Sequence, residues 1–422
     1  MQFRTVLRHL LGMLAAMVII RWRLVTDGRD RPLVEVRVRH RRRPSGRYPC
    51  GRCGAPAARY DRGRGAPRRW RHLDMGFGTC ELVARLWRVD CPGCGPTTVG
   101  VSWARHGSAF TRAFEDLVAY TAVAANKSHA ARRYGIGWKA VDNICERVLA
   151  EALNGVDLLE GLVAIGIDEV KAKKGQRYLT VVSDHFTGRV IWAKKGRSKD
   201  VVGKFFDDLG EDRSKALGFV TADGAEWIRT VVAERAPDAV ICLDTFHLIG
   251  WATKALDEVR RDTWQDLRAS GDADKATEFK GLRWVLLRNW ENLSGRQKGV
   301  IRDLATANKR MFRAWQLKEE LREIMAMGPI AAARALDDWL AWASRSKLGP
   351  FVKLARTVRR YRESIEATIE WRLTNGLAES NNSEIGRLRR NARGFHKPEK
   401  FITMVMLSRG ELCPDLPWQQ AA

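Results

Sequence analysis

The chain of 422 residues is too long for one ordinary hydrophobic core, and its length predicts two to four domains. A hydrophobic content of 45% and an aromatic content of 9% exclude a globally disordered protein. The charge is unusual, because 74 Lys and Arg against 49 Asp and Glu give a formal net charge of +25. This balance favours a polyanionic partner, and nucleic acid is the common one.

The positive charge is concentrated near the N-terminus. Residues 1–100 contain 21 Arg, no Lys and seven acidic residues, so less than a quarter of the chain carries +14 of the total. A surface that is merely soluble would spread its charge more evenly. We therefore expect an N-terminal region that faces nucleic acid.

One apolar run, LLGMLAAMVII at residues 10–20, resembles the core of a signal peptide. An Arg-Trp-Arg sequence follows it in place of a cleavage site, and eleven residues are too few to span a bilayer. The run predicts a short helix that leads into a strand. We expect a cytoplasmic, nucleoid-associated protein with no membrane partner.

Two cysteine pairs, Cys50-Gly-Arg-Cys53-Gly and Cys91-Pro-Gly-Cys94-Gly, have the spacing of zinc knuckles. Four thiolates complete a tetrahedral structural zinc site, although two unrelated pairs or a redox dithiol share this spacing. Cys80 lies in a segment typical of a strand, and the remaining cysteines are isolated. The sequence thus predicts a structural Zn²⁺ site formed by Cys50, Cys53, Cys91 and Cys94.

Period-2 alternation in MVIIRWRLV and PLVEVRVRH, which precede the cysteines, predicts a β-hairpin. Arg37, Arg39 and Arg41 would then line one face of the second strand. With the zinc site, this hairpin indicates a β-rich DNA-binding platform rather than a centre of catalysis.

Residues 108–153 are typical of three helices. Ser108 or Thr111 would cap the first helix, and Ser128 and Gly135 would bound the second. A short helix, a glycine turn and a longer helix match a helix-turn-helix, although an ordinary three-helix unit has the same pattern. In a DNA-reading unit, the third helix would bring its first residues to the major groove: Trp138, Lys139, Asp142 and Asn143.

From residue 160 the pattern changes to strands. GLVAIGIDEV, RYLTVVSDH and RVIWAKKG predict three consecutive strands, and ALGFVTAD and AVICLD predict two more, with amphipathic helices between the last three. This β-β-β-α-β-α-β order is that of a ribonuclease H-like fold. In such a fold the first and fourth strands are neighbours, so Asp168 and Asp223 would end side by side.

Roughly residues 249–373 are typical of helices and are rich in tryptophan, most of it expected in the core. After them, Glu379 begins a helix on which Asn382 and Ser383 share its face. Arg387, Arg389, Arg390 and Arg393 follow. Carboxylates from two strand ends and a helix, in a very basic chain, favour a site where two divalent cations cleave a phosphodiester. Arg387 and Arg390 could hold the DNA backbone beside it.

Asp244 and His247, in LDTFHL, lie just after the fifth predicted strand and near the same edge of the sheet. A histidine in this position is more often a structural hydrogen-bonding partner than a base. Both interpretations of His247 stay open.

Taken together, GIDEVKAKKGQRYLTVVSD, ADGAEW, LDTFHL and GLAESNNSEIGRLRRNARGF resemble the DDE-type insertion-sequence transposases of the ISL-three group. The CxxC…CPxCG segment is similar to the N-terminal zinc domain of that family. The resemblance covers about residues 45–407. It implies a catalytic triad of Asp168, Asp223 and Glu379, with Asp244 and His247 as an accessory motif. Related proteins often carry a basic residue seven positions after the glutamate, where this chain has Gly386.

The sequence thus predicts a multidomain α+β protein whose regions follow one another along the chain. We expect an N-terminal helix and β-hairpin, a zinc-binding β-rich domain, a helix-turn-helix domain, and a ribonuclease H-like α/β catalytic core in two parts around an all-helical insertion. The N-terminal helix and hairpin would span residues 1–45, the zinc-binding domain 46–105 and the helix-turn-helix domain 106–157. The catalytic core would comprise residues 158–248 and 374–422, and the helical insertion residues 249–373.

The expected activity is metal-dependent DNA transposition, with two Mg²⁺ or Mn²⁺ ions at the carboxylates. Cleavage at terminal inverted repeats would free a 3′-OH, which would then join to target DNA. Pairing of two ends predicts a homodimer or a larger synaptic complex. Two alternatives are a DNA-binding regulator with a degenerate catalytic domain and a nuclease for RNA or hybrids that performs no strand transfer.

Overall fold

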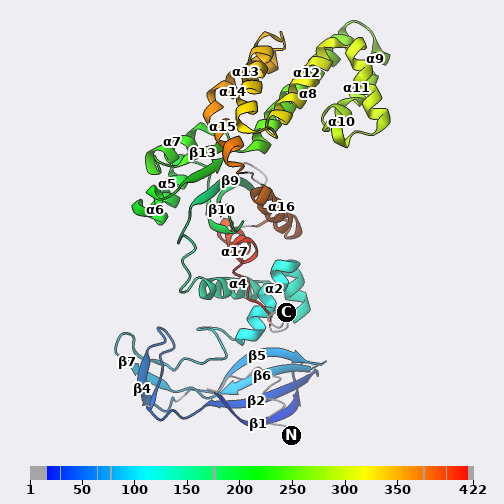
Figure 1. Cartoon of the computed structure of the whole chain (residues 1–422). Coiled ribbons are helices and arrows are strands. Elements are labelled where there is room, and N and C mark those ends of the chain that lie inside the picture. The colour runs from blue at the N-terminus through cyan, green and yellow to red at the C-terminus, as the bar shows by residue number, and fades with distance from the viewer. Residues whose placement is uncertain are drawn as a thin grey trace. The chain divides into compact units, whose positions relative to one another are not determined.

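The computed structural model describes residues 17–28, 30–63, 65–76, 78–173, 177–373, 376–395 and 397–416. The chain divides into two compact units, which Figure 1 draws along one ribbon. The first unit is Met1–Val156 with Asn391–Arg393 and Glu411–Ala422, and the second is Asp157–Arg390 with Gly394–Gly410. The helix expected at the start of residues 10–20 lies outside the described residues, and residues 17–20 lie in the first strand.

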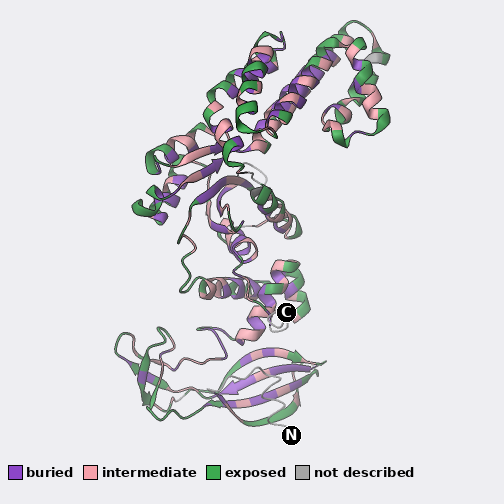
Figure 2. Cartoon of the chain, viewed as in Figure 1, coloured by how far each residue is buried: buried purple, intermediate pink, exposed green. Residues whose placement is uncertain are grey.

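The first unit contains a four-stranded sheet in the order β1-β2-β6-β5. The predicted hairpin of β1 and β2 is confirmed, and β6 pairs parallel to β2 and antiparallel to β5. One face packs around Val36, Trp70, Leu82 and Trp103, whereas most of β1 is exposed (Figure 2). The strand bounds are Met17–Thr26 for β1, Pro32–His40 for β2, Arg68–Met75 for β5 and Gly78–Ala84 for β6.

A second, smaller sheet of the same unit carries the cysteine pairs. Its strands lie in the order β3-β4-β7-β8, and each neighbouring pair is antiparallel. Cys80 lies outside this sheet, in β6, as a strand residue as its sequence context predicts, and it is fully buried. The strand bounds are Arg47–Pro49 for β3, Pro56–Asp61 for β4, Arg88–Cys91 for β7 and Gly95–Thr98 for β8.

Three helices complete the first unit, namely α2 (Arg112–Ala124), α3 (Lys127–Tyr134) and α4 (Trp138–Ala152). Thr111 caps α2, since its side chain accepts a hydrogen bond from the backbone N–H of Phe114. The prediction that Ser128 caps the second helix is wrong. Asn126 is the N-cap, and α3 begins one residue before Ser128.

The second unit is built on a five-stranded sheet in the order β11-β10-β9-β12-β13. The hairpin strands β9, β10 and β11 are antiparallel, whereas β12 runs parallel to both β9 and β13. Thus the first and fourth strands of the unit are neighbours, as predicted. The strand bounds are Ala164–Lys173 for β9, Arg177–Asp184 for β10, Val190–Lys195 for β11, Phe219–Ala222 for β12 and Val240–Leu243 for β13.

Helices α5 and α7 pack on this sheet, with Phe205 and Ile228 fully buried between the layers. The amphipathic pattern of SKDVVGKFFDDL explains this packing, because Val202, Phe205 and Leu209 recur on one helical face. Helix α17 packs against β11. The helix bounds are Lys199–Leu209 for α5, Glu211–Lys215 for α6, Glu226–Arg235 for α7, Gly376–Asn391 for α16 and Pro398–Arg409 for α17.

Between β13 and α16 the chain is helical from Thr245 to Trp371, with a core of its own around Trp339, Leu336 and Phe351. Trp339 is fully buried and donates its indole N–H to the carbonyl of Leu317, whereas Trp284 and Trp371 are exposed. No helix in the described part of the chain is long and apolar enough to cross a membrane. The helix bounds are Thr245–Ala269 for α8, Ala273–Gly281 for α9, Arg283–Leu286 for α10, Gly295–Ala307 for α11, Lys309–Ile324 for α12, Pro329–Arg345 for α13, Gly349–Arg360 for α14 and Arg362–Trp371 for α15.

Candidate active site and DNA-binding elements

The four predicted cysteine ligands converge in the smaller N-terminal sheet. Their sulfur atoms all lie within 4.8 Å of one another, and the Sγ atoms of Cys53 and Cys91 are 3.5 Å apart. Four thiolates around one tetrahedral zinc ion at about 2.3 Å would be spaced by about 3.8 Å. Among the described residues, they are the one group of three or more Cys, His or acidic side chains close enough to hold a metal ion.

The local backbone shapes both knuckles and favours the thiolate form of Cys50. Gly54 and Gly95, which follow the second cysteine of each pair, have φ angles of +75° and +67° and so turn the chain at each knuckle. Burial opposes ionisation of Cys50, but the backbone N–H groups of Cys53 and Arg52 lower the pKa of its thiol to about 6. The donor set and its geometry fit a structural zinc ion.

The helix pair α3 and α4 has the spacing that the sequence predicts. Gly135 ends α3 in the left-handed conformation, and Gly137 precedes α4. Trp138, Lys139 and Asn143, which we expected to face DNA, are exposed on α4.

Asp142, unlike Trp138, Lys139 and Asn143, is not exposed on α4. Its side chain is buried in an ion pair with Lys127, whose ammonium also lies 5.7 Å from the ring of Trp138. The expectation that Asp142 approaches the major groove is therefore wrong, because the carboxylate holds α3 against α4 instead.

In the second unit, Asp168 and Asp223 lie at equivalent points of neighbouring strands. Ile167 of β9 pairs with Ala222 of β12, and each aspartate is the next residue. Asp223 follows the end of β12. Asp168 does not end its strand as expected, because β9 continues to Lys173 in its hairpin with β10.

Asp168 is held on the sheet by two donors. The backbone N–H of Glu169 lies 2.6 Å from its Oδ1, and the side-chain amide of Asn382 on α16 donates to its Oδ2. Burial raises the pKa of the Asp168 carboxyl despite these hydrogen bonds.

Asp244 and His247 form a tight pair at the start of α8. Asp244 caps the helix by accepting from the backbone N–H of Phe246 at 3.0 Å, and its Oδ2 lies 2.7 Å from Nδ1 of His247. Since an ionised carboxylate only accepts, Nδ1 carries the proton and Nε2 is left for another partner. The hydrogen bond that His247 donates to Asp244 raises the pKa of His247, and the charges of Asp244, Asp223 and Asp168 add to this shift.

Glu379 lies in the first turn of α16 and is exposed. The described structure does not gather its carboxylate with those of Asp168 and Asp223 into a ready metal-binding group. Further along α16, Arg387 is paired with Glu384 and Arg389 donates to the carbonyl of Lys171, whereas Arg390 is exposed.

Three family models match consecutive stretches of the chain. A zinc-finger model of the transposases IS204/IS1001/IS1096/IS1165 matches residues 47–94, and a helix-turn-helix model of transposase family ISL3 matches residues 100–149. A transposase model of the ISL3 family matches residues 165–405, which is more than half of the chain. The chain belongs to the ISL3 family of transposases.

Individual transposases agree with the family models. The chain is 41% identical over 387 residues to the transposase for insertion sequence element IS1557 of Mycobacterium tuberculosis, from strains CDC 1551 / Oshkosh and H37Rv, and the match covers 87% of each chain. It is also 26% identical over 323 residues to the transposase for insertion sequence element IS1001 of Bordetella parapertussis. That match covers 76% of this chain and 78% of the relative. The protein is therefore a DNA transposase with a zinc ribbon and a helix-turn-helix for DNA binding.

Sequence reasoning missed one acidic residue of this ISL3 transposase, Glu169. Its side chain is 8% exposed and pairs with Arg197 at 2.9 Å, while Oε1 is buried without a hydrogen-bond partner among the described residues. Burial and then the negative charge of Asp223 raise the pKa of Glu169 to about 7. The two adjacent acids in GIDEV were the available signal.

Asn381 is a second residue that the sequence did not single out. Its side chain is 1% exposed, and its amide nitrogen donates to Ser183 Oγ at 3.1 Å and to the carbonyl of Gly188 at 2.9 Å. Its Oδ1 accepts from Arg409 of α17. One asparagine thus joins α16 to β10, to the turn before β11 and to α17.

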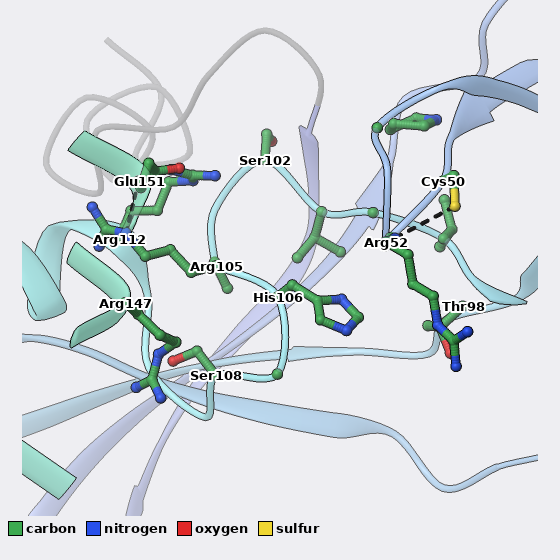
Figure 3. A pocket seen from close by; sticks show the side chains of 18 of the residues that line it. Cys50, Arg52, Thr98, Ser102, Arg105, His106, Ser108, Arg112, Arg147 and Glu151 are labelled. Carbon is green, nitrogen blue, oxygen red and sulfur yellow. Dashed lines mark hydrogen bonds and ion pairs between the residues drawn. The ribbon is translucent and has the colours of Figure 1, made fainter. Parts of the chain in front are cut away.

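A cavity of about 1030 Å³ lies in the first unit beside the zinc knuckle (Figure 3). Its wall includes Arg105, which is paired with Glu115 at 3.2 Å, Asp116 at 2.6 Å and Glu151 at 2.7 Å. Arg147 is also paired with Glu115. These cations are neutralised inside the protein, so this part of the wall stabilises the unit.

Proposed function

We propose that the transposase cleaves and joins DNA by a DDE mechanism in which Asp168, Asp223 and Glu379 hold two divalent cations, Mg²⁺ or Mn²⁺. The strand order of the second unit supports a ribonuclease H-like catalytic core, with Asp168 and Asp223 on neighbouring strands. In this proposal residues 158–248 and 374–422 are two parts of one core, and the helical residues 249–373 are an insertion in it.

The contact between Asn382 and Asp168 carries the proposal. It brings α16 to the catalytic strand from 214 positions away in the sequence. Glu379 precedes Asn382 by three residues, and residues at this spacing are neighbours on one helical face, with Cβ atoms about 5 to 6 Å apart. The helix that holds Asp168 therefore presents the third carboxylate on the same side.

The residues present suit hard divalent cations. All the donors are carboxylate oxygens, which Mg²⁺ and Mn²⁺ prefer. Burial raises the pKa of Asp168 and of its neighbour Glu169, so negative charge is costly here without a cation, and Oε1 of Glu169 has no partner among the described residues. When bound, the cations would stabilise the charge on the attacking and leaving oxygens of the phosphodiester.

Two phosphoryl transfers follow in this proposal. In the first, a water oxygen bonds to phosphorus at the transposon end, the bond to the 3′-oxygen breaks, and that oxygen takes a proton to leave a 3′-OH and a 5′-phosphate. In the second, this 3′-OH bonds to a target phosphorus and displaces a target 3′-oxygen. The backbone N–H of Asp244 donates to the carbonyl of Ala222, the residue before Asp223, at 3.0 Å. The Asp244 and His247 pair therefore lies near Asp223, where the imidazole would hold a proton or position the phosphate.

DNA recognition is divided in this proposal. Trp138, Lys139 and Asn143 of α4 would read terminal inverted repeats, and Arg387 and Arg390 of α16 would contact the backbone of the cleaved strand. Because two ends must be joined together, we propose a homodimer or a larger synaptic complex.

The test compares Asp223→Asn with Asp238→Asn, a matched change at an exposed position before β13. With repeat-bearing DNA and Mg²⁺, Asp223→Asn should abolish cleavage and strand transfer while end binding persists. Asp238→Asn should behave like the unmodified protein. Strand transfer retained by Asp223→Asn on a pre-cut end would refute the assignment.

A further inference from the structure

Arginines cover the solvent-facing side of the β1-β2-β6-β5 sheet. Strand pairing places Arg21 opposite Arg37, Arg37 beside Val83, and Val83 opposite Arg69, which makes one row across all four strands. Directly paired residues of a sheet project from the same side, so these side chains share a face. In β2, β6 and β5 the opposite side packs into the buried core around Val36.

The adjoining row of paired residues on the same face has the buried carboxylate of Glu35 at its centre. Arg23 lies opposite Glu35, and Glu35 pairs with Glu81. Glu35 is 1% exposed, and its carboxylate accepts hydrogen bonds from three arginines. Arg23 donates two of 2.9 Å, Arg69 one of 2.7 Å and Arg37 one of 3.3 Å. The hydrogen bond from Arg23, which outweighs the opposing effect of burial, and those from Arg69 and Arg37 hold the pKa of Glu35 at about 2.

This carboxylate fixes three guanidinium groups without using up their donors. A guanidinium carries five N–H donors, and Arg37 uses one of its own on Glu35. The side chains of Arg23, Arg37 and Arg69 remain 47%, 41% and 50% exposed. Arg21 and Arg39 are also exposed and have no acidic partner among the described residues.

We propose that this surface, the arginine face (Arg21, Arg23, Arg37, Arg39 and Arg69), binds the phosphate backbone of duplex DNA without reading its sequence. Prearranged guanidinium groups suit phosphate oxygens, and Glu35 reduces the entropy that binding would otherwise cost. A cluster that only stabilised the fold would not need this excess of arginines over acids. The zinc-finger model begins at residue 47, after both β1 and β2. Four of the five arginines of this face therefore lie outside the ranges that the family models match.

The experiment measures the affinity of the zinc-loaded, full-length protein for a fluorescent random-sequence duplex across a range of salt concentrations. The variant is Arg21→Gln/Arg37→Gln/Arg39→Gln, which leaves Glu35 paired with Arg23 and Arg69. A matched control, Arg296→Gln/Arg334→Gln/Arg345→Gln, removes the same charge from exposed positions of the helical segment. The lysine triple variant at positions 21, 37 and 39 tests whether charge alone restores binding.

If each of the three arginines contacts one phosphate, affinity should fall about 10- to 100-fold near physiological salt, and the slope of log K against log salt should shrink by about 2 to 3. The lysine variant should recover most of the slope. The ratio of affinities for repeat-bearing and random duplexes should stay constant, because backbone contacts carry no sequence information. An unchanged slope, an equal loss in the control triple variant, or a collapse of that ratio would each overturn the proposal.

Discussion

The cysteine cluster and the proposed carboxylate site of this transposase are built in opposite ways. Each cysteine pair comes from one short local segment, and the four sulfur atoms already lie within 4.8 Å of one another. The proposed carboxylate ligands come from β9, from the residue after β12 and from α16, and the helix reaches β9 through the amide of Asn382. One site is complete within its own sheet, whereas the other depends on how a distant helix is docked.

This difference follows from what each site has to do. A structural zinc ion needs a closed tetrahedron, and its binding energy is folding energy. The proposed site for phosphoryl transfer has to stay open to DNA, so its acids come from separate elements. Beside it, burial and then the negative charge of Asp223 raise the pKa of Glu169 to about 7. Zinc loss should therefore destroy structure, and loss of helix docking should destroy rate.

The largest effect is expected for Cys53→Ser. Removing one thiolate from a structural site should abolish stable zinc binding, which is worth about 10 to 16 kcal/mol in zinc-finger peptides near neutral pH, and the smaller N-terminal sheet should unfold. Zinc content by mass spectrometry and binding of repeat-bearing DNA should fall together. Cys413→Ser, at a half-buried cysteine outside the cluster, should keep both. Full zinc content in the Cys53 variant would remove this residue from the ligand set.

The next largest effect is expected for Asn381→Leu, which tests the docking of α16. The change leaves Ser183, the Gly188 carbonyl and Arg409 without their shared partner, and unsatisfied buried polar groups cost about 1 to 3 kcal/mol each. We expect kcat for cleavage to fall about 100-fold and Kd for transposon ends to rise much less, because the helix-turn-helix of the first unit keeps its own contacts with DNA.

The control for that variant is Ser380→Ala, at an exposed position one residue earlier on the same helix. It should leave kcat within about twofold, as expected for a surface change. The decisive readout is the Mg²⁺ concentration needed for half-maximal cleavage, which should rise for Asn381→Leu if α16 positions a ligand. A lower Tm with unchanged kcat and Mg²⁺ dependence would make Asn381 a purely stabilising residue.

A smaller effect concerns Glu35 and acid stability. Its pKa is lowered to about 2 by the hydrogen bond from Arg23 first, against the opposing effect of burial, so its ionised form stabilises the fold at pH values above its ordinary pKa. This contribution should be lost as pH falls from about 4.5 to about 2. We expect ionised Glu35 to contribute about 1 to 2 kcal/mol to the free energy of unfolding. This is less than its pKa shift alone implies, because the arginines are half exposed and water screens their charges. Chemical denaturation between pH 6 and pH 3 should show this slope in the unmodified protein and a weaker one in Glu35→Gln.

Local patterns in the sequence predicted much of this structure. The CxxC spacing identified all four cysteines of the cluster, and the apolar runs gave the five strands of the second unit in their order along the chain. These features succeed because each depends on residues only a few positions apart. The assignment of Asp168, Asp223 and Glu379 as the catalytic triad stays a prediction.

The errors arose where a residue's role depends on packing. Asp142 has the position of a DNA-reading residue on its helix, but α3 brings Lys127 against it and buries both. Asp168 follows an apolar run, yet β9 continues past it because β10 offers a longer partner strand than β12. The buried role of Asn381 depends on the rotation of α16, which two adjacent asparagines in a sequence cannot specify.

The smallest predicted effect separates two possible caps of the helix before the recognition helix. Asn126 accepts the backbone N–H of His129 at 2.7 Å, whereas Ser128 is exposed within the first turn of α3. Asn126→Ala should cost about 1 kcal/mol and lower the Tm of the first unit, since an orphan N–H loses its acceptor. Ser128→Ala should change stability by less than about 0.5 kcal/mol, as expected for a surface position. Equal losses in the two variants would mean that both side chains satisfy the N-terminal end of α3, and that the turn before α3 can exchange one cap for the other.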